Sequence, residues 1–324
     1  MEYRTLGRTG LRVSVAGLGC GGNSQLGLGQ GKSEADAIRL VRAAFDLGVN
    51  FLDTAEAYGT EEVVGKAIAG RPRESVVIST KSRIRAGGER LSPADILANL
   101  DASLRRLATD HVDIFHLHAV PEADYDWVMS EVLPGLIRVK EQGKIRHLGI
   151  TESSPRDPDQ VMLQRAVNDE CWEVMMFAFH MMHQVAREAL FPATQRNGIG
   201  TLLMFVVRNI FSRPGLLSET MRALAEEGKV DRSFAAMEQP LDFLVHEGGA
   251  RSIIDAAYRF ARHEPGSDVV LFGTGSIEHL KSNVDSILAP PLPREDVERL
   301  YTLFGHLRGV GLDLPDRSRV YPKG

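Results

Sequence analysis

Phe51-Leu52-Asp53-Thr54-Ala55-Glu56-Ala57-Tyr58-Gly59 is the stretch from which the fold of this chain can be read. It is an apolar, strand-like segment that stops at an acid, Asp53, and breaks into a loop carrying Tyr58. Short apolar runs bounded by turn residues are typical of buried strands. The apolar runs before Lys81 and before His118 end on ionisable groups in the same way. The sequence thus predicts three strands whose ends carry groups able to hold charge or move protons.

Strand-like and helix-like segments alternate about eight times along the chain. The predicted strands are residues 15–20, 50–54, 76–80, 112–117, 145–151, 174–179, 201–207 and 268–272. The segments between them place apolar residues at helical spacing, and the clearest one opens with Ser92-Pro93, a cap followed by a first-turn proline. This alternation is typical of a parallel sheet, and eight such units predict its closed form, an α/β fold of the (β/α)8 TIM-barrel type.

Three segments fall outside the eight units. Residues 3–15 contain Gly7-Arg8-Thr9-Gly10 between two short mixed runs, which indicates an N-terminal β-hairpin. Residues 211–249 form a long insertion after the seventh strand. Residues 294–307 have the pattern of an extra C-terminal helix lying over the outside of the barrel. We see no linker, so we expect residues 1–324 to form a single domain.

Composition narrows the function classes. The chain has 324 residues and a net charge of −5, which gives no electrostatic reason to expect nucleic acid or an anionic membrane as a partner. Its two cysteines, Cys20 and Cys171, make no disulfide framework, and the N-terminus lacks the apolar core of a signal peptide. We therefore expect a cytoplasmic protein with a small-molecule ligand. The oligomeric state has no signature in the sequence.

The ionisable groups at the strand ends suggest a chemistry. In such barrels the loops at the carboxyl ends of the strands carry the active site, so Asp53, Tyr58, Lys81 and His118 are expected to converge there. A lysine ammonium beside a tyrosine lowers the pKa of the phenol, and an acid keeps the lysine charged. These groups suit the protonation of an oxygen during reduction of a carbonyl. The alternative is that each is a polar residue with a local partner.

The chain resembles the aldo-keto reductase family over nearly its whole length. The resemblance is carried by Tyr3–Ser14, by Gly17–Cys20, by Asp53-Thr54-Ala55 with Tyr58-Gly59, by Lys81 and His118 in that order, by residues 143–150, and by residues 272–280 with Asn283. It implies that Tyr58 is the general acid, that Lys81 and Asp53 tune it, and that His118 orients the carbonyl. It also implies a nicotinamide cofactor, usually NADPH, as the hydride source; NADH is not excluded.

The same resemblance implies a set of cofactor-binding residues. They are Gly19, Cys20, Asp53, Thr151, Glu152, Met176, Met204, Arg208, Gly273, Thr274, Ser276, His279 and Asn283. Arg208 follows the seventh strand, where it is expected either to clamp a phosphate or to be a surface arginine. Backbone N–H groups near Gly273 and Ser276 are expected to bind phosphate at a helix start.

Three positions depart from the family pattern. Thr151-Glu152 stands where the family usually has Ser-Asn, Met176 where it has glutamine, and Met204 where an aromatic residue stacks on the nicotinamide. Thr151 can still donate a hydrogen bond, Glu152 can accept one from the carboxamide, and Met204 offers a polarizable surface. The alternative is that these are ordinary barrel side chains and that the cofactor site has been lost.

Two other sequence patterns suggest a different nucleotide site and a metal site. Gly17, Gly19 and Gly22 match the dinucleotide fingerprint G-x-G-x-x-G, but no helix pattern begins at the third glycine, so a strand-one loop at the barrel mouth is the better interpretation. His180 and His183 suggest a metal site, yet no cysteine or carboxylate pair stands at ligand spacing. We therefore expect no metal.

The sequence thus predicts an NAD(P)H-dependent oxidoreductase that reduces an aldehyde or ketone to an alcohol, or runs in reverse, with Tyr58 as general acid. A second hypothesis is a catalytically weak or inactive nucleotide-binding or regulatory protein on the same barrel, motivated by Glu152, Met176 and Met204. An isomerase or lyase using the Lys81–Tyr58 pair has no separate support in the sequence.

Overall fold

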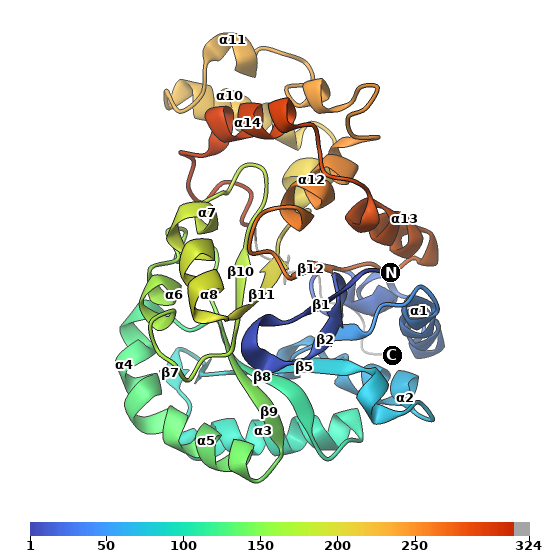
Figure 1. Ribbon diagram of the computed structural model, residues 1–324, viewed down its shortest axis with the longest axis vertical. Helices are drawn as coiled ribbons and strands as arrows, with labels where there is room; N and C mark the ends of the chain where they lie inside the picture. Colours follow the sequence, from blue (N-terminus) through green and yellow to red (C-terminus); the bar gives the residue numbers. More distant parts are fainter. Residues whose placement is uncertain (314–324) are drawn as a thin grey trace.

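Eight parallel strands form a closed barrel, which confirms the predicted fold class (Figure 1). A computed structural model describes residues 1–313 of the chain. The strands, in the order in which they pair around the barrel, are β3 (Ala16–Gly19), β4 (Phe51–Asp53), β5 (Val77–Arg83), β8 (Val112–His118), β9 (Ile145–Thr151), β10 (Val174–Ala178), β11 (Gly200–Met204) and β12 (Val269–Phe272). The closed barrel rules out the open sheet that a dinucleotide fingerprint would require.

Two strand boundaries differ from the predicted ones in ways that matter for the site. Strand β5 continues past Lys81 because it stays paired with β8 as far as Arg83 opposite His118. Lys81 therefore lies within a strand rather than at its end. Strand β11 stops at Met204 because the next residue, Phe205, has a φ of 63°, in the left-handed region.

The N-terminal hairpin closes one end of the barrel. Strands β1 (Tyr3–Thr5) and β2 (Arg12–Ser14) pair antiparallel, as predicted. Apolar side chains from the hairpin join the lowest interior layer of the barrel, which contains Leu6, Val13, Phe51, Val77, Ile114, Val174, Met176, Leu202, Val269 and Leu271. Because this end is filled by side chains, a ligand can approach the barrel interior only from the carboxyl ends of the strands.

Helices cover the outside of the barrel. Those that follow the strands are α1 (Glu34–Asp46), α2 (Glu61–Ile68), α3 (Pro93–Leu107), α4 (Tyr125–Trp127), α5 (Leu133–Glu141), α6 (Val161–Ala166), α7 (Ala186–Ala189), α8 (Phe191–Asn197), α12 (Ile253–Arg262) and α13 (Ile277–Leu288). Ser33 with Asp36, and Ser92 with Asp95, form the capping boxes that start α1 and α3. A π-helical turn, Val128–Val132, joins α4 to α5.

The long insertion builds a lobe beside the barrel mouth. It contains α9 (Asn209–Ser212), α10 (Leu216–Glu226) and α11 (Arg232–Ala235). The C-terminal helix α14 (Arg294–Phe304) lies with this lobe at the top of Figure 1. Phe304 of α14 packs against Phe234 of α11, with ring centroids 6.1 Å apart. The expected C-terminal helix is thus present, but it packs against the insertion because its apolar side chains are buried there.

Further details complete the architecture. A small hairpin, β6 (Arg85–Ala86) with β7 (Glu89–Arg90), follows β5, and Asp124 accepts hydrogen bonds from Arg85 and Arg90.

Across the part of the chain that the structure describes, no helix is both long and apolar enough to span a membrane. The single domain expected for residues 1–324 stays a prediction, and residues 314–324 lie outside the described residues.

The contact between hairpin and barrel can be tested at Gly7. Its φ is 48°, and a Cβ there would lie 2.3 Å from the backbone nitrogen of Gly200. Gly10 also has positive φ, 75°, but a Cβ there would meet nothing within 4 Å. We expect Gly7→Ala to cost about 3 kcal/mol of unfolding free energy in denaturant titration, from strain plus overpacking, and Gly10→Ala about 1 kcal/mol from strain alone. Equal losses in the two variants would contradict this packing.

Candidate active site

Four ionisable side chains meet at the carboxyl ends of adjacent strands. Asp53 is the last residue of β4, Lys81 lies near the end of β5, and His118 is the last residue of β8. Tyr58 ends the short 3-10 turn Glu56–Tyr58 that follows β4. Since β4, β5 and β8 are neighbours in the barrel, the structure brings the four predicted residues together at its open end.

The centre of this group is a buried ion pair. The Nζ of Lys81 lies 2.7 Å from Oδ2 and 2.8 Å from Oδ1 of Asp53, and it also donates to the carbonyl oxygen of Thr54 at 2.8 Å. The side chain of Lys81 is 0% exposed and that of Asp53 is 6% exposed. The hydroxyl of Ser79 donates to Asp53 at 2.8 Å. Both carboxylate oxygens are therefore bound, and the ammonium is fixed in direction.

Tyr58 stands over this ion pair. The Nζ of Lys81 lies 5.0 Å from the centroid of the Tyr58 ring. The ring of His118 meets that of Tyr58 edge-on, with centroids 5.8 Å apart and an interplanar angle of 85°. Gly21, in the loop after β3, also lies against this ring: a Cβ there would come within 2.6 Å of the Tyr58 ring. Glycine at this position therefore leaves room for the tyrosine.

The pKa of Tyr58 reflects two opposing effects. Burial raises it, and this effect outweighs the lowering by the Lys81 ammonium, while the Asp53 charge raises it further. The lowering by Lys81 is therefore present as expected, but the net shift is upward because of burial. For Lys81, burial lowers the pKa, but Asp53 and Tyr58 together outweigh burial and the pKa is raised. The site thus pairs a protonated phenol with a charged ammonium over a wide pH range.

His116 is a buried neighbour that the sequence analysis overlooked. It pairs in register with Lys81 on one side and with Gly149 on the other. A Cβ on Gly149 would lie 2.2 Å from Nδ1 of His116, so the imidazole occupies the space that glycine leaves. Burial, Lys81 and His118 hold the pKa of His116 well below its usual value. The histidine sits within an apolar strand run, where a packed core residue has the same sequence pattern.

The residues after β9 are tied to neighbouring backbone. The hydroxyl of Thr151 accepts from the N–H of Ala119 at 2.7 Å. Oε1 of Glu152 accepts from the N–H of Ala178 at 2.9 Å, and Gln160 donates to the carbonyl oxygen of Ala178 at 2.9 Å. Oε2 of Glu152 is buried without a hydrogen-bond partner among the described residues. Burial raises the pKa of Glu152 to about 8, so the carboxyl is largely protonated near neutral pH.

Two methionines lie where the family has other residues. Met176 is buried in the interior layer that also contains Leu202 and Leu271. Met204, the last residue of β11, is partly buried and packs against this layer. The structure therefore gives Met176 an apolar packing role, and it leaves part of Met204 at the open end of the barrel.

The two other segments predicted to bind cofactor lie on neighbouring strands. Gly19 ends β3, and the N–H of the following residue, Cys20, donates to the carbonyl oxygen of Asp53 at 2.8 Å. Burial raises the pKa of the Cys20 thiol. Gly273 and Thr274 follow β12, on the opposite neighbour of β3.

A lysine that the sequence analysis did not single out lies beside the loop after β12. The Nζ of Lys32 donates to the carbonyl oxygen of Gly275 at 2.5 Å. Ser276 caps α13 by accepting from the N–H of His279 at 3.5 Å. His279 is exposed on the first turn of α13, and Asn283 is partly buried on the next. The loop after β3 thus brings a cation to the segment expected to bind phosphate.

Arg208 is held inside the structure. Its side chain is 12% exposed, and Nη2 lies 3.1 Å from Oδ2 of Asp313. The guanidinium carbon lies 4.2 Å from the centroid of the Phe205 ring. This burial excludes the alternative interpretation, in which Arg208 is an exposed surface arginine.

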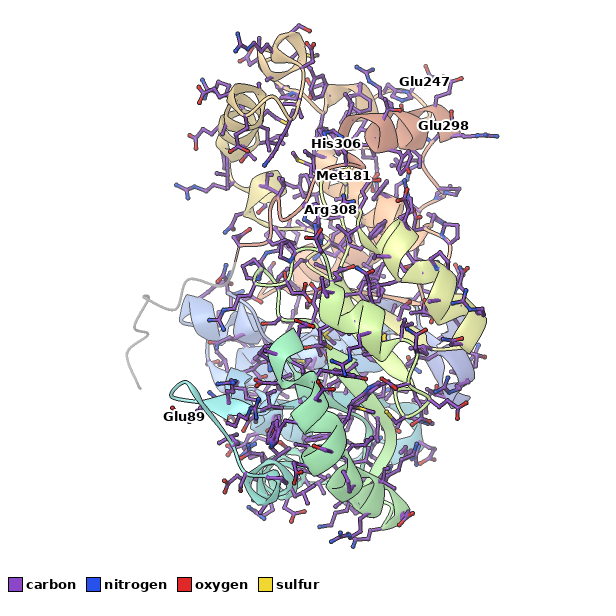
Figure 2. The ribbon with its side chains drawn as sticks, turned by 90° about the vertical axis from the view of Figure 1, so that its left-hand side faces the viewer. Glu89, Met181, Glu247, Glu298, His306 and Arg308 are labelled. Carbon is purple, nitrogen blue, oxygen red and sulfur yellow. The ribbon has the colours of Figure 1, made fainter. Side chains whose placement is uncertain are left out.

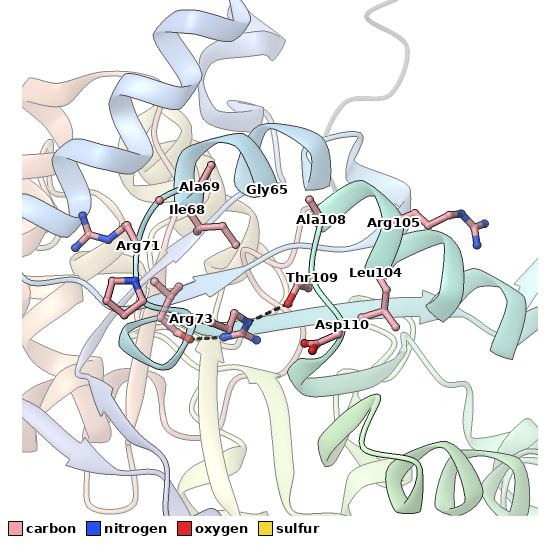
Figure 3. A pocket seen from close by; sticks show the side chains of 13 residues that line it. Gly65, Ile68, Ala69, Arg71, Arg73, Leu104, Arg105, Ala108, Thr109 and Asp110 are labelled. Atoms are coloured by element: carbon pink, nitrogen blue, oxygen red, sulfur yellow. Dashed lines mark hydrogen bonds between the residues drawn. The ribbon is translucent and has the colours of Figure 1, made fainter.

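A prominent cavity lies away from these groups. It has a volume of about 720 Å³ and lies between α2 and α3, lined by residues such as Ile68, Leu104 and Val76 (Figure 3). Val76 immediately precedes β5, so the cavity is at the amino end of that strand, far along the barrel from Lys81. Arg73 closes part of it with hydrogen bonds to Thr109 and to the carbonyl oxygen of Val76. Enzymes with this fold place their chemistry at the opposite end.

The two histidines considered as metal ligands are buried beside each other. The ring centroids of His180 and His183 lie 5.9 Å apart. Burial lowers the pKa of His183 to about 4 and that of His180 well below its usual value. Within residues 1–313, no three His, Cys, Asp or Glu side chains are grouped so that they could hold a metal ion.

Comparisons with known proteins agree with this geometry. The model of the Aldo/keto reductase family matches residues 17–303. L-galactose dehydrogenase of Arabidopsis thaliana is 34% identical over 208 residues, which are 62% of this chain and 64% of that protein, so the match spans less than two thirds of that relative. Aldo-keto reductase YhdN of Bacillus subtilis is 28% identical over 328 residues, covering 94% of this chain and 93% of that protein.

Solved structures show the same similarity. The holo form of aldo-keto reductase AKR11C1 from Bacillus halodurans superposes with a TM-score of 0.70 at 26% identity, covering 93% of this chain and 96% of that one. The family match includes all four side chains that meet at the barrel mouth. Since it extends over most of the sequence, the chain belongs to the aldo/keto reductase family of oxidoreductases.

Proposed function

We propose that this protein is an NAD(P)H-dependent oxidoreductase that reduces an aldehyde or ketone, or runs in reverse, with Tyr58 as the general acid. One observation carries the proposal: Lys81, fully buried, is fixed between Asp53 and Tyr58 at the open end of the barrel. Within the aldo/keto reductase family, this arrangement supports proton delivery to an oxygen that gains charge as a carbonyl is reduced.

Each of the four residues has a distinct task in the proposal. Asp53 holds Lys81 protonated, and Lys81 stabilises the phenolate that forms when Tyr58 releases its proton. The raised pKa of Tyr58 keeps that proton in place until a substrate oxygen draws it away. In this proposal His118, whose ring meets that of Tyr58 edge-on, hydrogen-bonds the same oxygen.

The residues expected around the nicotinamide fit the group in part. When bound, the cofactor supplies hydride to the carbonyl carbon. Oε2 of Glu152 is buried and without a hydrogen-bond partner among the described residues, so the protonated carboxyl would donate to the carboxamide oxygen and the ionised carboxylate would accept from the carboxamide N–H. The partly exposed Met204 offers a polarizable surface at the barrel mouth. The Thr151 hydroxyl accepts from Ala119 and donates to the carbonyl oxygen of Glu152 at 3.4 Å, and Met176 is packed in the core. The Glu152 carboxyl is therefore the group in this region most suited to the carboxamide.

The proposal also covers the cofactor preference, the substrate class and the cellular location. We infer a preference for NADP(H), because Lys32 brings a cation to the Gly273–Ser276 loop and His279 stands on the first turn of α13. NAD(H) is the second choice. We propose a small carbonyl or alcohol as the substrate and the cytoplasm as the location. Neither nucleic acid nor a membrane is a proposed partner.

A second candidate function is nucleotide binding with little or no turnover. It is favoured by the core packing of Met176 and by the hydrogen bond of Glu152 to Ala178, both of which differ from the expected nicotinamide contacts. Binding of NADPH, measured by its fluorescence, without turnover of any carbonyl in a broad panel would favour this second function.

The role of Tyr58 is tested by Tyr58→Phe. We expect kcat with NADPH and a carbonyl substrate to fall about 10²- to 10⁴-fold, because the proton donor is lost, while NADPH affinity is kept. Tyr301→Phe, which removes the same atom from an exposed tyrosine that bonds Glu188, is the matched control and should leave kcat unchanged. The measurement is nicotinamide absorbance over time, and undiminished turnover by Tyr58→Phe would exclude Tyr58 as the acid.

The burial of Glu152 predicts a pH-dependent stability. Its pKa in the folded state, about 8, is above the ordinary value of 4.5, so folding favours the protonated carboxyl. Stability is therefore lost as pH rises from about 4.5 to 8, and the penalty is complete above that. We expect the gain in unfolding free energy from Glu152→Gln to be larger at pH 9 than at pH 6, by a few kcal/mol.

Asp255→Asn is the control for this experiment. The pKa of Asp255 is lowered although burial raises it, because hydrogen bonds from Arg251 and Ser286 outweigh the burial, and neither partner titrates between pH 6 and pH 9. Its contribution is present at both pH values, so Asp255→Asn should destabilise the protein by a similar amount at pH 6 and pH 9. Denaturant titrations at both pH values give the comparison. A Glu152→Gln effect that is the same at both would show that Glu152 is ionised in the folded protein.

A further inference from the structure

Arg208 is a buried cation whose carboxylate partner comes from the far end of the chain. Oδ2 of Asp313 accepts from Nη2 of Arg208 at 3.1 Å and from the side-chain nitrogen of Asn209 at 2.7 Å. Arg208 and Asn209 stand just beyond β11, at the same end of the barrel as Lys81. The carboxylate thus binds two neighbouring side chains of the loop that follows β11.

The segment that carries Asp313 is fitted closely to this place. The N–H of Gly309 donates to Nδ1 of His183 at 3.3 Å. Gly311, with a φ of 68°, packs so tightly that a Cβ would lie 3.0 Å from Ile210 and 3.2 Å from His180. Figure 2 shows Arg308, at the start of this segment, in the same region as Met181 from the loop after β10. The position of Asp313 is therefore determined by packing along several residues.

A cavity opens beside the carboxylate. It has a volume of about 480 Å³, and Asp313, Asn209 and Arg213 line it together with Pro155, Leu216 and Leu312. Pro155 follows β9 and Asn209 follows β11, so the cavity lies at the carboxyl ends of the strands. A ligand in it would meet the cation of Arg213 and the carboxylate of Asp313 at the same wall.

Asp313 uses only part of what Arg208 offers. A guanidinium binds a carboxylate or a phosphate best through two parallel N–H bonds. Here the hydrogen bond comes from Nη2 alone, while Nε is buried and has no hydrogen-bond partner among the described residues. A phosphate, with more oxygens and more charge than a carboxylate, would satisfy more of these donors.

The family resemblance already suggests that the loop after β11, which carries Arg208, binds a phosphate. We propose that the Asp313 carboxylate occupies the donors of Arg208 and Asn209 in the free protein, and that a phosphate group of the incoming ligand displaces this carboxylate. Identification of that ligand as a nicotinamide dinucleotide rests on the function proposed above. The competition between Asp313 and a phosphate does not depend on it. Because the Asp313 carboxylate must leave before a phosphate can bind, its interaction with Arg208 lowers the affinity of the site for phosphate.

The test compares Asp313→Asn with the unaltered protein. Inorganic pyrophosphate binding is measured by calorimetry and NADPH binding by fluorescence, at one salt concentration. We expect Asp313→Asn to tighten both about fivefold to tenfold, because a charged competitor has been removed. Asp159→Asn removes the same charge from a nearby carboxylate that pairs with Arg308, and should change neither affinity by more than about twofold.

A second comparison links the gain to Arg208. In an Arg208→Gln background, Asp313→Asn should bring no further tightening, since the two effects share one interaction. Unchanged or weaker pyrophosphate binding by Asp313→Asn, or no binding to either protein, would overturn the proposal even if carbonyl turnover is found. If pyrophosphate binding tightens while NADPH binds neither protein, the competition stands and the proposed cofactor is wrong.

Discussion

The arrangement of this site depends on the ion pair between Lys81 and Asp53. An ammonium removed from water is costly unless a carboxylate and further hydrogen bonds replace the lost solvent. Here both oxygens of Asp53 and the carbonyl of Thr54 supply that replacement. The pairing is possible because β4 and β5 are neighbours with Asp53 opposite Ser79, so Lys81 stands two residues further along the same face. The barrel register thus fixes the geometry of the proton-transfer groups.

The two ends of the barrel divide stability from chemistry. The hairpin fills the amino end with apolar side chains, and Gly7 allows it to lie against the backbone of Gly200. The strands and loops toward the other end carry buried side chains with perturbed pKa values: Lys81, His116, Glu152 and Cys20. Because apolar side chains fill the amino end of the barrel, water is excluded there. The ion pair at the carboxyl end therefore stays buried.

Local sequence signals predicted the fold well. The apolar runs predicted the strands, Ser92 marked a helix start, and the alternation of strands and helices predicted the closed barrel, which the structure confirms. The same strand ends indicated which four side chains would meet. What could not be predicted depends on burial or on distant contacts. The raised pKa of Tyr58 is one case, because burial outweighs Lys81 only once the barrel is closed.

Contacts between segments far apart in the sequence could not be predicted either. Asp313 meets Arg208 across more than a hundred residues, and Lys32 reaches Gly275 from the other end of the chain. His116 lies in an ordinary strand pattern, and only its fit against Gly149 shows that it is a close neighbour of Lys81. The predicted C-terminal helix α14 is present outside the barrel, but its contact with α11 of the insertion could not be predicted, because an amphipathic pattern does not show what a helix packs against.

The most direct test of the account is the pH dependence of hydride transfer, followed in single turnovers, for Asp53→Asn beside the unaltered protein. Without the carboxylate, burial dominates the pKa of Lys81 and lowers it, so the ammonium loses its proton earlier. We expect the alkaline limit of the rate to move down by at least about one pH unit. Superimposable profiles would show that the pair between Asp53 and Lys81 does not govern proton delivery by Tyr58.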